Sequence, residues 1–191
     1  MRPTFLTLAL ALAPLVTTSS TAAPRVLSIT NDGRGYAGFR IDDTLDTVDG
    51  TTGRVSGGVR LDAENLAASS VVLSVDVSSL DTGNEMRDAQ MRKTLETKKY
   101  PFAVFRSTSV IGPVILEPNH LTEAKLVGDF TLHGVTRRIN VPVHLVLTPA
   151  GQLLASGRFT IRMTDYDIEV PDKLIVSVAN EVTLRFELTA R

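Results

Sequence analysis

The sequence has 191 residues, with 20 Lys and Arg side chains against 21 Asp and Glu, and a formal net charge of -1. This balance argues against a nucleic-acid-binding protein, which needs an excess of basic side chains on one face, so no nucleic-acid partner is expected. The chain is 43% hydrophobic and 21% charged and has no Cys, a composition that excludes a disordered protein, a multi-span membrane protein, disulfides and a cysteine nucleophile.

The N-terminal segment is typical of an export signal. Arg2 supplies a positive charge, and no charged side chain occurs from Pro3 to Pro24. The apolar run Phe5–Val16 is about 12 residues long, which matches the hydrophobic region of a signal peptide and is shorter than the roughly 20 residues of a membrane span. We therefore predict a signal peptide over 1–22, cleaved after Ala22, and one mature domain over 23–191 in the periplasm. An uncleaved anchor is the alternative.

Beyond Ala23 the dominant pattern is alternation of apolar and polar residues, which predicts β-strands with one buried face. The alternating segments are 37–42, 55–62, 71–78, 105–110, 126–132, 139–147, 155–163 and 182–189. Seven or eight one-sided strands predict a barrel or a sandwich, and their hairpin spacing favours an up-and-down barrel, because closure removes exposed edges. The fold class is thus mainly β, a single antiparallel barrel of about eight strands.

Charged side chains share the opposite parity in these segments, which predicts that they face solvent. They are Arg40, Asp42, Arg60, Asp62, Asp76, Asp129, Arg158, Arg162, Arg185 and Glu187. A membrane barrel would instead present an apolar band outward.

The segment 81–97 breaks the strand pattern and predicts one short helix of about three turns, which would cover one end of the barrel. Thr82 with Glu85 three residues later fits a capping box. Arg87 and Asp88 would either tie the helix to loop backbone, the favoured interpretation, or clamp an anion.

The sequence offers little for catalysis or metal binding. His120, His133 and His144 lack metal-ligand spacing, and His133-Gly134 predicts a hairpin turn. Four acidic residues, Asp42, Asp43, Asp46 and Asp49, fit a cation site or, as we favour, a solvated loop. We therefore expect neither a metal nor a cofactor.

The barrel interior is the remaining candidate site. Its inward positions are aliphatic or Phe, so it is either a filled core or a tunnel for one slender apolar ligand, and composition does not decide between them. By strand parity the candidate lipid-binding residues are Phe39, Val75, Phe105, Phe130, Leu132, Val143, Phe159, Ile161 and Leu184.

Several motifs resemble the YceI-like family over about residues 24–190. They are Ser78-Ser79-Leu80-Asp81-Thr82-Gly83-Asn84, Arg87-Asp88 with Met91, Tyr100-Pro101 through Phe105-Arg106-Ser107-Thr108, Gly128–Thr136, and Asn180–Leu184. The resemblance implies a lipocalin-like, periplasmic barrel that binds polyisoprenoid chains in an apolar tunnel, and a possible homodimer. Many relatives carry histidines in the stretch where this chain has Asp46 and Asp49, which implies a different headgroup preference.

The leading hypothesis is therefore an exported protein that holds an isoprenoid-type lipid, polyprenyl or quinone, without turnover. One alternative is an enzyme acting on an apolar substrate, with Asp46 or Asp49 as a tunnel-facing carboxyl of raised pKa. The other is a filled-barrel stress or interaction module that binds its partner on the outside.

Overall fold

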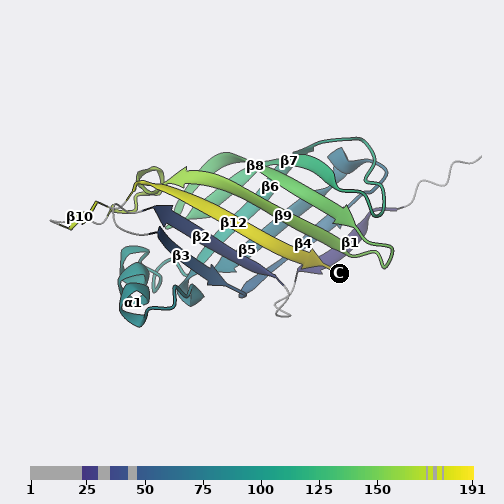
Figure 1. Ribbon diagram of the computed structural model, residues 1–191. Coiled ribbons are helices and arrows are strands. Elements are labelled where there is room, and N and C mark those ends of the chain that lie inside the picture. The colour runs from purple at the N-terminus through teal and green to yellow at the C-terminus, as the bar shows by residue number, and fades with distance from the viewer. Residues whose placement is uncertain (1–22, 30–34, 43–46, 171, 174–175, 178) are drawn as a thin grey trace, which may run out of the picture.

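A closed antiparallel barrel dominates the molecule (Figure 1). The computed structural model describes residues 23–29, 35–42, 47–170, 172–173, 176–177 and 179–191. Eight strands follow one another around the ring, and the last pairs with the first: β1 (Arg25–Ile29), β4 (Val55–Leu61), β5 (Ser70–Asp76), β6 (Phe102–Ile111), β7 (Thr122–Leu132), β8 (Val135–Leu147), β9 (Leu153–Arg162) and β12 (Glu181–Ala190). The predicted mainly β fold is confirmed.

A hairpin of β2 (Tyr36–Asp42) and β3 (Thr47–Thr52) completes the wall beside β12. The middle of β12, from Thr183 to Glu187, pairs with β2, whereas its end pairs with β1 through Ala190 and Ile29. Thr51 of β3 bridges to Asp81, and the two residues exchange backbone hydrogen bonds of 2.9 Å. Two short strands, β10 (Asp172–Lys173) and β11 (Val176–Ser177), pair with each other in a separate sheet.

The β7–β8 hairpin shows how the local sequence sets the register. His133 and Gly134 have φ angles of 51° and 79° between the two strands, and two successive positive φ angles are typical of a type I′ turn, whose twist matches that of the flanking strands. The predicted hairpin turn is confirmed. Eleven consecutive residue pairs, from Thr122–Leu145 to Leu132–Val135, follow from it.

The helix α1 (Glu85–Thr94) lies at one end of the barrel, near β3 (Figure 1), as predicted. The predicted capping box is wrong, because Asn84 is the N-cap and accepts hydrogen bonds from the backbone of Met86 and Arg87. The hydroxyl of Thr82 instead donates to Asp88, at 2.6 Å. We call this end of the barrel the α1 end.

Arg87 and Asp88 tie α1 to the preceding loop, which confirms the favoured interpretation of this pair. Asp88 is buried and also accepts from the backbone N–H of Thr82, at 3.0 Å. Arg87 donates to the hydroxyl and to the carbonyl oxygen of Thr82, at 3.0 and 2.9 Å. One threonine thus holds both side chains.

The opposite end of the barrel is closed by two connections that bond to each other; we call it the capped end. Leu66, in the 3₁₀ turn η1 (Leu66–Ala68), donates its backbone N–H to Val114, and Leu116 donates to Ala63, at 2.8 and 2.7 Å. Leu61, Leu66 and Leu116 are at most 2% exposed. Buried leucine side chains therefore pack at this end of the barrel.

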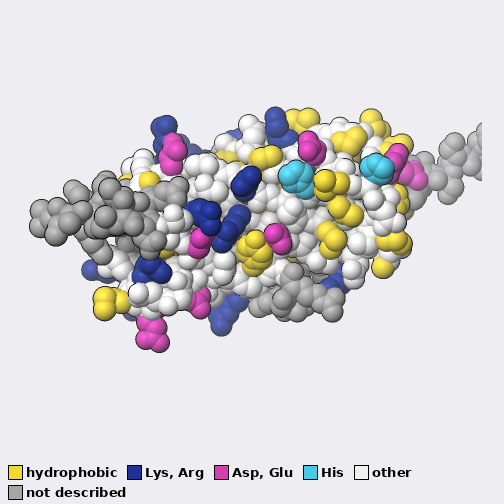
Figure 2. Space-filling view, viewed as in Figure 1, with side chains coloured by type: hydrophobic (Ala, Val, Ile, Leu, Met, Phe, Trp, Pro, Cys, Tyr) yellow, Lys and Arg dark blue, Asp and Glu magenta, His cyan; other side chains and the backbone are white. Residues whose placement is uncertain are grey.

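The outer surface carries charged side chains scattered over the face in Figure 2, with hydrophobic side chains gathered toward the capped end. Exposed hydrophobic residues in the connections and strand ends at the capped end include Ile111, Val114, Ile115, Leu121 and Leu154. Two further 3₁₀ turns are η2 (Val77–Ser79) and η3 (Met163–Tyr166). None of the helices in the described part of the chain is long and apolar enough to cross a membrane.

Candidate ligand-binding tunnel

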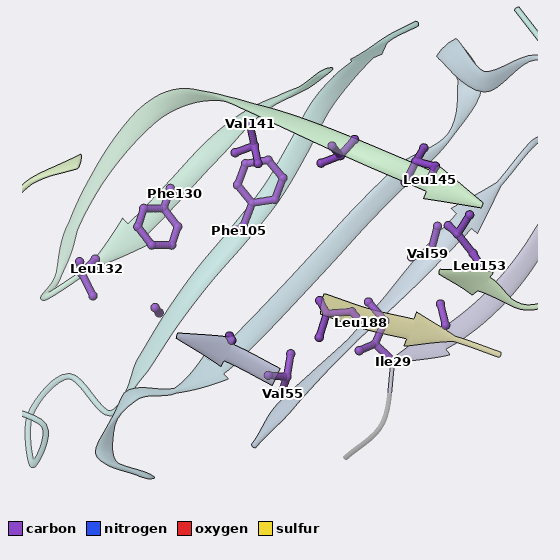
Figure 3. Close-up of a cluster of buried hydrophobic side chains, with 14 of the residues drawn as sticks. Ile29, Val55, Val59, Phe105, Phe130, Leu132, Val141, Leu145, Leu153 and Leu188 are labelled. Carbon is purple, nitrogen blue, oxygen red and sulfur yellow. The ribbon is translucent and has the colours of Figure 1, made fainter. Parts of the chain in front are cut away.

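The barrel is hollow. A cavity of about 780 Å³ runs through its interior from α1 to the leucines of the capped end. Figure 3 shows part of its wall, with Leu132 and Phe130 toward one end and Leu153 and Ile29 toward the other. Because the interior contains this cavity, the alternative of a filled barrel is wrong.

All nine side chains chosen by strand parity lie on the wall of this cavity. They are Phe39, Val75, Phe105, Phe130, Leu132, Val143, Phe159, Ile161 and Leu184. They come from seven different strands, and they share the wall because side chains along a strand alternate between its two faces. That they contact a lipid stays a prediction.

Polar groups on the cavity wall gather at the α1 end. The polar residues that border the cavity there are Thr82, Asn84, Arg87, Gln90 and Thr94, beside the apolar Met91 of α1 and Leu95 at its C-terminal cap. At the capped end the polar lining residues are Ser69 and Ser70, and the hydroxyl of Ser69 accepts from the backbone of Asp62. Along the strands, Arg185 of β12 also borders the cavity. The rest of the wall between the two ends is apolar, with a polar, cationic rim at the α1 end.

Aromatic rings stabilise the wall near the α1 end. Phe130 meets Phe159 edge to face, with ring centroids 5.8 Å apart, and meets the buried Tyr166 at 5.7 Å. Such pairs contribute about 0.5–1.5 kcal/mol beyond the area they bury. Burial raises the pKa of Tyr166 to about 12, so its hydroxyl stays neutral in this apolar surrounding.

Of the two carboxylates suspected of catalysis, Asp49 lies within the described residues, and it does not border the tunnel. Asp49 lies on β3 outside the cavity, where it accepts two hydrogen bonds from Arg40 and lies 3.0 Å from Nη2 of Arg185. The hydrogen bond from Arg40, helped by the charges of Arg185 and Arg40, holds the pKa of Asp49 below its ordinary value, although burial opposes them. The enzyme hypothesis requires a carboxyl that faces the tunnel and has a raised pKa. Asp49 has neither property.

The other members of the acidic cluster are Asp42, at the end of β2, and Asp43 and Asp46. Asp43 and Asp46 lie outside the described residues, and so does the predicted signal peptide. Within the described ranges, no group of three or more His, Asp or Glu side chains is placed to hold a metal ion.

The three histidines lie away from the tunnel lining. His120 and His144 are exposed on the surface, beside Glu117 and Glu123. His133 is largely buried in its turn, where its Nδ1 lies 3.1 Å from the carbonyl oxygen of Tyr166 and its ring packs edge-on against Tyr100. Its contacts join the β7–β8 turn to η3.

Sequence reasoning missed the tunnel residues that lie outside the regular strands. They are Met91 of α1, Leu95 at the C-terminal cap of α1, and Leu66 of η1, all of which border the cavity. Met163 of η3 borders it too, on the inward face that alternation over 155–163 predicts. The spacing of Met91 and Leu95, four residues apart in a polar helix, is the signal that predicts a shared inward face.

We compared the sequence and the fold with those of known proteins. The family model of the YceI-like domain matches residues 26–190. The chain belongs to the YceI-like family. A UPF0312 protein of Vibrio cholerae is 29% identical over 178 residues, which cover 89% of this chain and 90% of the relative. Protein YceI of Escherichia coli O157:H7 is 31% identical over 143 residues, or 73% of this chain and 71% of the relative.

Solved structures show the same fold at lower identity. BcnA of Burkholderia cenocepacia superposes with a TM-score of 0.73 at 23% identity, covering 85% of this YceI-like chain and 99% of BcnA. A polyisoprenoid-binding domain from Saccharophagus degradans, implicated in plant cell wall breakdown, gives a TM-score of 0.67 at 19% identity, covering 87% and 97%.

Proposed function

We propose that this protein binds a long isoprenoid-type lipid, a polyprenyl chain or a quinone, in the barrel tunnel and carries or sequesters it without chemical turnover. The observation that supports this function is the hollow barrel with an apolar wall from α1 to the capped end. The description of the Saccharophagus degradans domain as polyisoprenoid-binding supports the same ligand class.

The physical basis of binding is burial of hydrocarbon. Each CH₂ group taken out of water contributes about 0.8 kcal/mol, or about 25 cal/mol per Å². A long chain gains this along the whole tunnel, whereas a compact apolar molecule gains it over only part of the wall. The polar rim at the α1 end, with Asn84, Arg87 and Gln90, suits a headgroup, so in our proposal the lipid enters tail first at that end.

Export is part of the proposal. The N-terminal pattern of Arg2 followed by the apolar run Phe5–Val16 supports a signal peptide over 1–22 and a mature domain over 23–191 in the periplasm. A lipid carrier placed there would move or store a water-insoluble chain between membranes.

The first test is organic extraction and mass spectrometry of the mature protein purified from its own periplasm. We expect one isoprenoid lipid per protein, with its headgroup read from the mass. Native mass spectrometry of the same sample reports whether two copies assemble. An empty protein that takes up neither added polyprenol nor added quinone would contradict the proposal.

A matched pair of variants makes this test specific for the tunnel. Ala155 lines the cavity and the adjacent Ser156 points to the opposite face of β9. Ala155→Phe fills the lumen and should remove the copurifying lipid, whereas Ser156→Phe adds the same ring outside and should keep it.

A further inference from the structure

Phenylalanine rings and strand glycines pair along the tunnel wall. Phe39 of β2 lies directly opposite Gly50 of β3, and its ring occupies the place of the missing side chain, since a Cβ on Gly50 would lie 2.7 Å from the ring Cζ. Phe186 of β12 lies opposite Gly157 of β9 in the same way, with a corresponding distance of 2.8 Å.

A third ring follows the same arrangement across a diagonal. Phe105 of β6 leans over Gly128 of β7, where an added Cβ would lie 2.6 Å from the ring Cζ. All three rings border the cavity. Each ring therefore lies along the wall, over a residue with no side chain, and does not reach across the lumen.

We propose that these glycines set the width of the tunnel and thereby its selectivity for methyl-branched isoprenoid chains over straight alkyl chains. The inference rests on the lipid-binding function proposed above and adds which kind of lipid chain the tunnel prefers. An isoprenoid chain carries a methyl group on every repeating unit, so it needs a wider passage than a linear chain. A ring displaced into the lumen excludes the wider chain first.

Gly50 is the position at which this inference is tested most cleanly. The nearest neighbours of a Cβ there are three atoms of the Phe39 ring, whereas at Gly128 and Gly157 a backbone carbonyl oxygen also blocks the site. On its other side Phe39 faces Leu184 of β12, another tunnel residue. The ring displaced by a methyl group at Gly50 therefore moves into the lumen.

The experiment measures competition between solanesol, a polyprenol, and octacosanol, a straight-chain alcohol, for the delipidated mature protein. We expect Gly50→Ala to weaken solanesol binding about tenfold or more, the usual scale of overpacking, and to change octacosanol binding by less than about twofold. Gly58→Ala is the matched control, because a Cβ there meets only the carbonyl oxygen of Leu27 at 3.7 Å; it should change neither affinity.

A second variant separates tunnel width from loss of folding. Phe39→Leu combined with Gly50→Ala removes the displaced ring and should restore solanesol binding. Unchanged preference in Gly50→Ala, or equal weakening of both ligands without restoration in the double variant, overturns the inference. Failure of the wild-type protein to bind either ligand would instead overturn the proposed function.

Discussion

Phe130 takes part both in the tunnel wall and in the packing of two other rings, Phe159 and Tyr166. It is 7% exposed, so a charge at this position would be buried without a partner, which costs several kcal/mol. We expect Phe130→Glu to abolish polyprenol binding and to lower the melting temperature. Phe130→Leu keeps the wall apolar and should lose only the ring contacts, about 1 kcal/mol of stability.

Calorimetric melting and mass spectrometry of bound lipid on the two variants check this prediction. Lipid retained by folded Phe130→Glu would show that the chain does not pass Phe130. A Phe130→Leu variant that folds but binds nothing would mean that the ring itself, and not the apolar wall, recognises the ligand.

At the level of strands, the sequence predicted the tunnel wall but not the tunnel. Alternation fixes which side chains share a face, because Cβ atoms along a strand point to opposite sides, and the nine wall residues follow from this geometry alone. The irregularity between Ser107 and Ser109 interrupts this rule, so that Phe105 and Val110 both border the cavity despite their odd separation.

The hollow interior depends on contacts between strands, which a single sequence does not display. Whether Phe39 crosses the lumen or lies along the wall depends on its neighbour on β3 being Gly50, eleven residues away along the chain. The error at the helix start has a similar cause. Both Thr82 and Asn84 are residue types that favour the N-cap position. The hydroxyl of Thr82 donates a hydrogen bond to Asp88, so Asn84 caps the helix instead.

The contact between Asp88 of α1 and the preceding loop predicts a pH dependence of stability. Hydrogen bonds from the hydroxyl and backbone of Thr82, with the charges of Arg92 and Arg87, hold the pKa of Asp88 below its ordinary value of 3.8, although burial opposes them. A lowered pKa means that the folded state favours the carboxylate, so its stabilising effect is present above the ordinary pKa and is lost as the pH falls through the lowered one.

We therefore expect Asp88→Asn to melt at a lower temperature than the wild type at neutral pH, and the gap to close as the pH is lowered from about 5 to about 2. Glu85→Gln is the matched control, because Glu85 is an exposed carboxylate in the same helical turn. A gap of constant size at every pH would show that Asn fails for steric reasons and that the charge of Asp88 plays no part.

For the whole molecule, a hollow barrel capped at one end relates ligand length to stability. A ligand that binds only the folded state stabilises it by RT ln(1 + [L]/Kd), and each further buried CH₂ strengthens binding by about 0.8 kcal/mol. This gain should stop when the chain reaches Leu61 and Leu66, which line the cavity at the capped end and are only 2% exposed. Additional isoprene units then stay in water.

We accordingly expect the melting temperature, measured with a series of polyprenols at a fixed excess, to rise with chain length and then to level off. Leu66 lines the cavity whereas Val114 is 70% exposed on the same end. Leu66→Ala should therefore move the plateau to longer chains, and Val114→Ala should leave it in place. A melting temperature that keeps rising with every added unit would mean that the chain passes through the capped end, and that the leucines there yield to a ligand that the apo barrel excludes.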